Sequence, residues 1–324
     1  MPHVVLLRSL HPDATAAIEA EPGFTVETVH DTSRENLVNA MARADAIIVR
    51  ATPINSDFLS FSPKLNIVAR HGVGYDQVDV TELTRRGIPL TVTADANALS
   101  VAEHAMMLML NMARGTQAFD ANTRAFKWST TEAPVTWDLS GMTLLVVGFG
   151  RIGGRVSRLA AAFGMDVLVC DPSVPMNTVK GAGFRYAKTL TEGLAQADWV
   201  TMHCPSNAEN RGMVNAEFLA AMKRGSRLVN TARGTLVEEE ALAAALRTGH
   251  LAAAGLDVFW EEPMRRENPL LQAPNVVMTP HSAAGTQQGM RRMGLSCVDS
   301  IVRHFRGEID MDMVINKEVI RSNR

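Results

Sequence analysis

The sequence predicts an α/β protein built from two doubly wound parallel sheets. Short apolar runs alternate along the chain with segments of helical period, a pattern typical of strand–helix–strand units. A long helical stretch near residue 99 interrupts the alternation, and a glycine-rich loop follows a strand only in the second half of the chain. A length of 324 residues is enough for about two domains.

The first hundred residues form the first strand–helix series. Two amphipathic segments, 14–20 and 35–44, separate apolar runs that are bounded by turn residues. Because strands that alternate with helices pair in parallel, this part predicts one parallel sheet. The expected strands are residues 4–10, 46–50, 66–70 and 89–93.

Residues 99–126 are helical in period throughout, and a second strand–helix series follows them. Its expected strands are residues 143–148, 166–170, 198–203, 227–231, 252–259 and 275–280, and its expected helices are 155–164, 216–225 and 238–249. A closing helix over 289–307 could pack on either domain.

Composition excludes several classes of protein. The 32 basic and 34 acidic residues are spread along the chain, so no basic block offers a nucleic-acid surface. The longest apolar run, 105–113, is too short to span a bilayer, and the first residues do not form a secretory signal. Three cysteines without CxxC spacing indicate neither disulfides nor a metal site. We therefore expect a soluble cytoplasmic protein whose partner is a small molecule.

The stretch LLVVGFGRIGGRV places Gly148, Gly150 and Gly153 in GxGxxG spacing, after a strand and at the start of a helix. In dinucleotide-binding domains the first glycine allows a tight turn and the second lets the backbone approach the pyrophosphate. The third lets helix and strand pack closely, while the helix N-terminus attracts the negative charge. The first half of the chain has no such loop, so one domain is expected to bind the dinucleotide.

Asp171 ends the strand that follows the glycine loop. A carboxylate there can accept hydrogen bonds from the adenosine ribose hydroxyls and would repel a 2′-phosphate. Since no Arg or Lys occurs between residues 172 and 179, NAD is the expected cofactor rather than NADP. The alternative interpretation of Asp171 is a turn acid before Pro172.

Three later strands lead to residues with the chemistry of hydride transfer at a 2-hydroxy or 2-oxo acid. Arg233 can pair with a substrate carboxylate and polarise a carbonyl, and His281 can exchange the hydroxyl proton. Glu262 can hydrogen-bond the histidine, fix its tautomer and raise its pKa. Each residue alone has an ordinary alternative, a surface salt bridge for Arg233 or Glu262 and a turn for His281. Because ligands of such sheets bind at the carboxyl ends of strands, their shared position favours a catalytic trio.

The chain resembles the D-isomer-specific 2-hydroxyacid dehydrogenase family, which includes D-3-phosphoglycerate, glyoxylate/hydroxypyruvate and D-lactate dehydrogenases. The resemblance covers nearly the whole length. It rests on RHGVGYDQVD (70–79), NALSVAEHAMMLML (97–110), DLSGMTLLVVGFGRIG (138–153), HCP (203–205), MKRGSRLVNTARG (222–234), GLDVFWEEP (255–263) and NVVMTPH (275–281). The family's catalytic arginine, glutamate and histidine fall on Arg233, Glu262 and His281.

The resemblance also implies the domain arrangement and further contacts. It implies a Rossmann NAD-binding domain, residues 99–285, inserted into a flavodoxin-like substrate domain of residues 1–98 plus 286–324, and two subunits that pair as a homodimer. The backbone of Val73 and Gly74 would hold the substrate carboxylate, and Arg50 would lie near the substrate's anionic end or form a plain salt bridge. The implied cofactor-binding residues are Arg151, Ile152, His203, Cys204, Pro205, Thr231, Ala232 and Asp257, in addition to the three glycines and Asp171.

Two departures from the family's patterns limit the assignment to a subfamily. The sequence ends about forty residues after His281, so we expect no C-terminal regulatory domain, and SAAGTQQG follows the histidine where IGGxTxEA is common. Within the fold, formate dehydrogenases pair their histidine with glutamine, which Glu262 argues against. A phosphite-type dehydrogenase and a non-enzymatic NAD(H)-sensing co-repressor remain alternatives.

Overall fold

The computed structural model describes residues 1–128 and 135–321, and the chain divides into two compact units. The first unit contains Met1–Asn97 and Ala284–Arg324, and the second contains Ala98–Ala283. The boundaries expected from the sequence differ from these by one residue at the first junction and by two at the second. The second unit is therefore an insertion in the chain of the first.

The first unit contains a sheet whose described strands run in the order β2-β1-β3-β4-β5. All neighbouring strands are parallel, and this order is that of the flavodoxin-like doubly wound fold. The order reverses between β1 and β3, which is the point where such sheets open a crevice for ligands. The strands are β1 (His3–Leu7), β2 (Thr25–Val29), β3 (Ala46–Val49), β4 (Ile67–Arg70) and β5 (Leu90–Val92).

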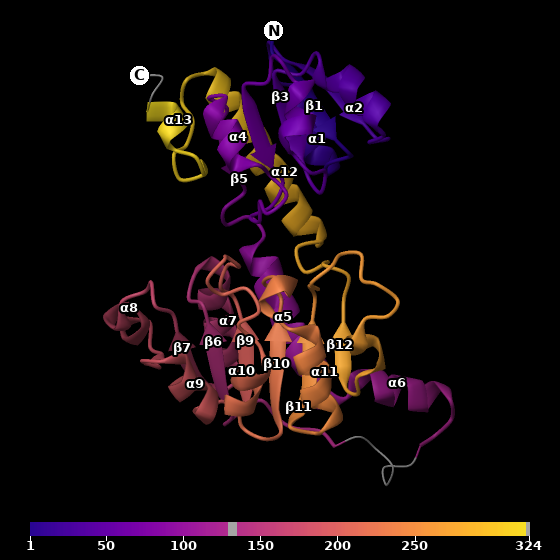
Figure 1. Ribbon diagram of the computed structural model, residues 1–324, viewed down its shortest axis with the longest axis vertical. Helices are drawn as coiled ribbons and strands as arrows, with labels where there is room; N and C mark the ends of the chain where they lie inside the picture. The colour runs from indigo at the N-terminus through magenta and orange to yellow at the C-terminus, as the bar shows by residue number, and fades with distance from the viewer. Residues whose placement is uncertain (129–134, 322–324) are drawn as a thin grey trace. The chain divides into compact units, whose positions relative to one another are not determined.

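Helices from both ends of the chain cover this sheet. The last long helix, α12, packs beside α1 although the two are far apart in sequence (Figure 1). Gly294 of α12 allows the close approach, because a Cβ there would lie 2.6 Å from Ala14 Cβ. The closing helix therefore belongs to the first unit. The helices are α1 (Pro12–Glu19), α2 (Arg34–Met41), α3 (Ser56–Ser60), α4 (Val80–Arg85), α12 (Gln287–Phe305) and α13 (Glu318–Arg321).

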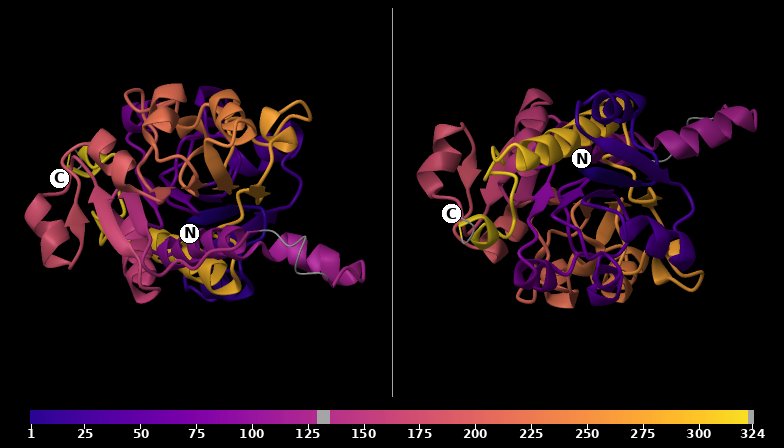
Figure 2. Two further views of the ribbon diagram at one scale, coloured as in Figure 1. Left: turned by 90° about the horizontal axis from the view of Figure 1, so that it is seen from below. Right: turned by 90° about the horizontal axis from the view of Figure 1, so that it is seen from above.

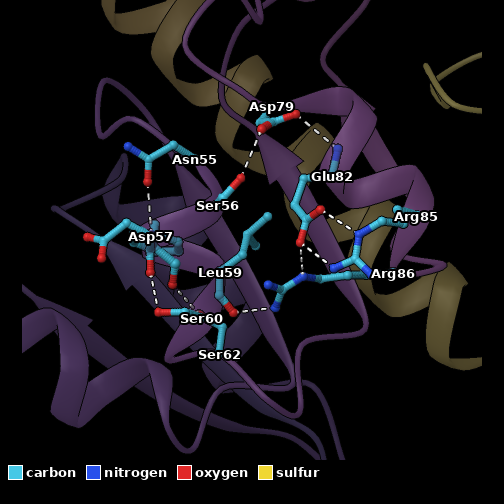
Figure 3. Close-up of polar contacts among 11 residues, drawn as sticks. Asn55, Ser56, Asp57, Leu59, Ser60, Ser62, Asp79, Glu82, Arg85 and Arg86 are labelled. Atoms are coloured by element: carbon cyan, nitrogen blue, oxygen red, sulfur yellow. Dashed lines mark hydrogen bonds and ion pairs between the residues drawn. The ribbon is translucent and has the colours of Figure 1, made fainter.

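Side-chain caps define the short helices α3 and α4 (Figure 3). Asn55 Oδ1 accepts the N–H of Phe58 at 2.9 Å, and Asp79 Oδ1 accepts the N–H of Glu82 at 2.9 Å. The Glu82 carboxylate also binds Arg85 and Arg86, so its pKa falls to about 2, chiefly because of the hydrogen bond from Arg85. Capping of this kind stabilises helices too short to persist alone.

The second unit contains a larger sheet, whose described strands run in the order β12-β11-β10-β9-β6-β7-β8. Counted from β6, this is the Rossmann order with one strand added, and every neighbouring pair is parallel. The order reverses between β6 and β9. The strands are β6 (Thr143–Val147), β7 (Asp166–Cys170), β8 (Arg185–Tyr186), β9 (Trp199–Met202), β10 (Ser226–Asn230), β11 (Leu251–Leu256) and β12 (Val276–Met278).

The long helical stretch at the start of this unit is two helices. Gly115 adopts a left-handed φ of 58° between them, which ends α5. Helix α6 has no buried residue and extends away from the sheet of its own unit (Figure 2). The helices and 3-10 turns are α5 (Ala98–Arg114), α6 (Thr116–Arg124), α7 (Arg151–Ala162), α8 (Met176–Gly181), α9 (Leu190–Gln196), α10 (Ala216–Ala221), α11 (Glu239–Arg247), η1 (Gly234–Leu236) and η2 (Pro269–Gln272).

Central strands of both units are buried on both faces. All five residues of β10 are buried, including Arg227. Its guanidinium lies 4.0 Å from the ring centroid of Trp137 and 5.0 Å from that of Trp199. Burial lowers the pKa of Arg227, and the two aromatic faces replace part of the lost hydration. No helix among the described residues is long and apolar enough to cross a membrane.

The structure confirms the predicted fold class of two doubly wound parallel-sheet domains. Two strands, β2 and β8, were not predicted from the sequence. Strand β2 carries Glu27 and is only half-buried, and β8 has two residues, so neither has an apolar run. The strand expected over residues 4–10 ends at Leu7, because Arg8 leaves the extended region with a φ of 78°.

Candidate active site

The glycine loop lies at the carboxyl end of β6, where the strand order reverses. A Cβ at Gly148 would lie 2.6 Å from the backbone nitrogen of Cys204, and one at Gly153 would lie 1.9 Å from the oxygen of Gly148. Gly150 is different, since nothing lies within 4 Å of the position of its Cβ. The first and third glycines therefore close the loop, and the second leaves its outer side open to a ligand.

Asp171 holds this loop from the end of β7. Its Oδ2 accepts the N–H of Phe149 at 2.7 Å, and its Oδ1 accepts the N–H of Ser173 at 2.8 Å. Each carboxylate oxygen retains a further lone pair after these bonds. The acid is therefore both a loop support and an acceptor that is still available to ribose hydroxyls.

Other expected cofactor residues lie along the same edge of the sheet, after β9 and β10. The His203 ring is buried, which lowers its pKa to about 3, and its Nε2 lies 2.8 Å from Thr201 Oγ1. Within the described residues, His203 Nδ1 and Thr231 Oγ1 are buried polar atoms with no hydrogen-bond partner. Buried polar groups in native proteins are usually paired, so these two indicate a polar ligand. Arg151 and Ile152 begin α7, Cys204 and Pro205 follow His203, and Ala232 follows Thr231.

Arg233 is brought to the site by a contact between neighbouring loops. A Cβ at Gly234 would lie 1.8 Å from the backbone carbon of Phe259, so only glycine lets the loop after β10 pack against the loop after β11. Asn230 strengthens the turn, because its side chain donates to Arg233 O and accepts from Ala232 N–H. The charge of Arg233 lowers the pKa of both Glu262 and His281, so its field reaches both groups.

Glu262 and His281 form the central pair of the site. His281 Nδ1 lies 2.6 Å from Glu262 Oε2, and the other carboxylate oxygen accepts the N–H of Phe259 at 3.0 Å. The hydrogen bond to Glu262 raises the pKa of His281, although burial acts in the opposite direction. For Glu262, burial favours the protonated form, but the bonds from His281 and Phe259 outweigh it and lower its pKa. The pair thus favours a charged imidazolium beside a carboxylate.

The turn that carries His281 is strained and is held by Asp257. His281 has a φ of 49°, a left-handed value that is uncommon for residues other than glycine, and its N–H donates to Asp257 O at 2.7 Å. The buried Asp257 carboxylate accepts bonds from Thr279 Oγ1 at 2.5 Å, Ser282 N–H at 2.8 Å and Ala283 N–H at 2.9 Å. Asp257 therefore anchors both sides of the histidine.

His104 joins this network, although the sequence alone indicates only packing for it. Its Nε2 lies 2.9 Å from Thr279 Oγ1 and 3.5 Å from Asp257 Oδ1. Burial lowers the pKa of His104, and the nearby Asp257 charge partly opposes this. Thr279 and His104 are thus supporting residues that sequence reasoning missed. The only signal in the sequence is a histidine on an otherwise apolar helix, which is also common in ordinary cores.

The expected substrate residues of the first unit follow β3 and β4 at the carboxyl edge of its sheet. Val73 and Gly74 lie in the loop after β4, and within the described residues no hydrogen bond is recorded for either backbone N–H. Arg50 directly follows β3 and is half-buried. It forms no salt bridge in the described part of the chain; its Nη1 donates to Ser9 O at 3.3 Å.

Comparison with known proteins identifies the family. Residues 106–283 match the NAD-binding domain of the D-isomer specific 2-hydroxyacid dehydrogenase family. The chain belongs to this family. A D-3-phosphoglycerate dehydrogenase of Mycobacterium bovis is 39% identical over 98% of this chain, and the match spans 61% of that protein's length. A glyoxylate reductase of Korarchaeum cryptofilum is 37% identical over 89% of this chain and 88% of its own.

Solved structures of the 2-hydroxyacid dehydrogenase family have the same fold. The crystal structure of a D-lactate dehydrogenase from Aquifex aeolicus, complexed with NAD and lactic acid, has a TM-score of 0.83 at 28% identity. It covers 94% of this chain and 96% of its own. A glyoxylate reductase from Paecilomyes thermophila has a TM-score of 0.87 at 27% identity, and the match covers 98% of this chain and 99% of that one.

The residues of the second unit fit the NAD that this family binds. Gly150 is the N-cap residue of α7, and its outer side is open. Because glycine has no side chain to cap the helix, the first backbone N–H groups of α7 remain available to a pyrophosphate. Asp171 has acceptor capacity for a ribose, and Thr231 and His203 offer unpaired polar atoms. These groups follow the neighbouring strands β7, β6, β9 and β10 and so lie along the carboxyl edge of one sheet, where a dinucleotide binds.

The histidine–glutamate pair makes a prediction about titration. Replacing Glu262 with Gln removes the charge and the strongest cause of the raised pKa of His281, so the pKa should fall and the imidazole should become neutral at a lower pH. NMR titration of the ring protons, assigned with a His281→Asn variant, measures this shift. Glu261→Gln, which changes a neighbouring exposed carboxylate paired with Arg265, is the control. An identical His281 pKa in wild type and Glu262→Gln would contradict the assigned role.

Proposed function

We propose that this chain is an NAD-dependent oxidoreductase that transfers hydride between the nicotinamide and a D-2-hydroxy acid/2-oxo acid pair. The observation that carries the proposal is the 2.6 Å contact between His281 Nδ1 and Glu262 Oε2, beside the charge of Arg233. A general acid or base with a raised pKa and a cation for a carboxylate are the two protein groups that this reaction needs.

The proposal gives the transferred proton to one ring atom of His281. Because Nδ1 is bonded to Glu262, Nε2 of His281 is the atom left to face the substrate oxygen. In reduction the imidazolium donates the Nε2 proton to the carbonyl oxygen, while NADH, when bound, supplies the hydride to the carbonyl carbon. In oxidation the neutral Nε2 accepts the hydroxyl proton. Glu262 keeps the ring in this orientation in both directions.

Arg233 would bind the substrate carboxylate and polarise the carbonyl, since a guanidinium offers paired donors in a fixed plane. In the first unit, Val73 and Gly74 would bind the substrate through their backbone N–H groups, which have no hydrogen-bond partner in the described part of the chain. Asp257 would contact the nicotinamide carboxamide. Its hydrogen bonds with Thr279 and Ala283 hold the histidine turn and involve both carboxylate oxygens.

The substrate would be a short acid of the 3-phosphoglycerate, glyoxylate or hydroxypyruvate kind. Relatives of these kinds, a D-3-phosphoglycerate dehydrogenase and a glyoxylate reductase, support this range. We also propose a cytoplasmic location, because all three cysteines are free thiols and show no disulfide spacing.

The second unit offers a surface for a second copy of the chain, and we propose a homodimer formed through it. Several large apolar side chains on or near α5, α6 and α7 are exposed, among them Met107 at 39%, Phe119 at 38% and Phe163 at 45%. Met107 and Phe163 border a groove of about 470 Å³ with a mostly apolar lining. Exposed apolar surface of this extent marks protein contacts, and the family resemblance implies pairing through this domain.

The first prediction concerns catalysis. His281→Asn keeps a residue that tolerates a left-handed backbone but removes the acid–base group, so kcat for 2-oxo acid reduction should fall about 10²- to 10⁴-fold. NADH affinity, measured by fluorescence, should change little. The assay follows NADH consumption with glyoxylate, hydroxypyruvate, 3-phosphohydroxypyruvate and pyruvate, with His3→Asn as the control. A fully active His281→Asn enzyme would exclude the mechanism, and tight NADH binding without turnover of any acid would favour a sensor.

The second prediction concerns cofactor choice. Asp171→Ser removes the charge that would repel a 2′-phosphate, so the ratio of kcat/KM with NADH to that with NADPH should fall about tenfold or more. Asp166→Ser, at the opposite end of the same strand, should leave the ratio unchanged. An unchanged ratio in the Asp171 variant would mean that this carboxylate does not contact the ribose.

The third prediction concerns association. Met107→Glu places a charge in the apolar groove and should shift the mass in light scattering from about twice 35.2 kDa towards the single chain. Met176→Glu, an equally exposed methionine on α8, should leave the mass unaltered. Dimers that survive the Met107 substitution at micromolar concentration would show that the chains pair elsewhere.

A further inference from the structure

One histidine of the second unit lies on a helix and yet reaches the carboxyl edge of the sheet. Helix α5 packs on β11 and β12. Gly255 of β11 permits a close approach, because a Cβ there would lie 3.0 Å from Leu108 Cβ. His104 lies one turn before Leu108 on α5, and its side chain is only 15% exposed. The packing of α5 thus brings a polar side chain to the strand ends that carry Asp257 and Thr279.

Asp257 and Thr279 are neighbours at this edge. Leu256, the last residue of β11, pairs in register with Met278, the last residue of β12, so the two polar residues come next on adjacent strands. Thr279 Oγ1 lies 2.5 Å from Asp257 Oδ1 and 2.9 Å from His104 Nε2. Because an ionised carboxylate only accepts hydrogen bonds, the Thr279 hydroxyl donates to Asp257 and accepts from His104.

The direction of these bonds fixes the tautomer of His104. Burial lowers the pKa of His104, so the ring is neutral near pH 7 and carries a single N–H. If that N–H were on Nδ1, both Nε2 and Asp257 Oδ1 would need the one proton of the Thr279 hydroxyl. The N–H is therefore on Nε2. The three side chains form a donor chain that runs from His104 through Thr279 to Asp257.

The donor chain leaves one acceptor position on Asp257 free. Oδ1 accepts from the Thr279 hydroxyl and from the N–H of Ser282 at 2.8 Å, which occupies its two lone pairs. Among the described residues, Oδ2 accepts only the N–H of Ala283, at 2.9 Å, and so retains a lone pair. Asp257 is fully buried, and a buried acceptor with unused capacity suits a polar donor such as an amide.

We propose that His104 is a positioning residue for the nicotinamide carboxamide of bound NAD(H), and that it acts through Thr279 and Asp257. The inference rests on the proposed function, in which Asp257 contacts that carboxamide. The donor chain keeps Oδ1 occupied and so presents Oδ2 to the carboxamide NH2. Without His104, the Thr279 hydroxyl could turn to a backbone carbonyl, and Oδ1 would lose a donor. The carboxylate would then no longer present one fixed oxygen to the carboxamide.

The test compares the binding of NADH with that of its 3-acetylpyridine analogue, in which a methyl ketone replaces the carboxamide and the NH2 donor is absent. His104→Leu removes the ring on an apolar helix that suits leucine. The affinity for NADH should fall about 3- to 10-fold, and that for the analogue by less than about twofold. Calorimetry measures both affinities without turnover. Equal losses for the two ligands would indicate a packing defect alone and overturn the proposal, as would an unchanged NADH affinity.

Two further variants separate the hydrogen bonds from the shape of the side chains. His104→Gln keeps an N–H donor near the position of Nε2 and should bind NADH within about twofold of the wild type. Thr279→Val removes the hydroxyl with little change of shape, so it should cause the same selective loss. Adding His104→Leu to it should cause no further loss, because the chain is already broken. Failure of the Gln variant to retain affinity, or losses that multiply in the double variant, would contradict the donor chain.

His250→Leu is the matched control. His250 is also a half-buried histidine of the second unit, and its Nε2 lies 2.8 Å from Leu219 O, but it precedes β11 at the opposite edge of the sheet. Its replacement should leave both affinities unaltered.

The ¹⁵N NMR spectrum of the imidazole rings, assigned with His104→Gln, reports the tautomer directly. A His104 ring protonated on Nε2 supports the donor chain, and one protonated on Nδ1 overturns it. If the wild type binds NADH but reduces no 2-oxo acid, the proposed function fails. A selective loss of NADH affinity in His104→Leu would still support the role of His104 in that case, and equal affinities for both proteins would overturn it.

Discussion

Burial of the parallel strands on both faces is the constraint on which both units depend. A strand such as β3 or β10 has no exposed face, so a polar side chain within it must be buried. The polar residues of β10, Ser226, Arg227 and Asn230, are all buried, and the Arg227 guanidinium lies against two tryptophan rings. A polar side chain that is open to a ligand must therefore come from the residues after the strands. This explains why the glycine loop, Asp171 and His281 all occupy such positions in the second unit, and Arg50 in the first.

Within these loops, a few backbone positions determine which side chains meet. Gly234 permits two loops to touch and so brings Arg233 towards Glu262. Asp257 holds the turn on both sides of His281 and fixes its left-handed conformation. Hydrogen bonds and close backbone packing thus position the candidate pair of His281 and Glu262, whose side chains meet at 2.6 Å.

The fold class and the candidate trio could be predicted from the sequence because they depend on local patterns. Apolar runs, glycine spacing and the residues that follow strands can all be identified in the sequence. The backbone conformations of Arg8 and His281 are not, since a left-handed φ in a residue other than glycine leaves no trace in composition. Arg8 lies within the apolar run VVLLRSL, which predicts a strand that continues past Leu7. The support that His104 gives to Asp257 through Thr279 likewise depends on tertiary contacts.

The placement of the aromatic residues has a spectroscopic consequence. All four tryptophans of the chain, Trp128, Trp137, Trp199 and Trp260, belong to the second unit. Emission excited selectively at tryptophan therefore reports only on that unit. Two of the four indoles, those of Trp137 and Trp199, contact the Arg227 guanidinium of the central strand β10, so their emission should respond to opening of the core. Unfolding of the first unit alone would be silent in this signal, and a comparison with circular dichroism would separate the two transitions.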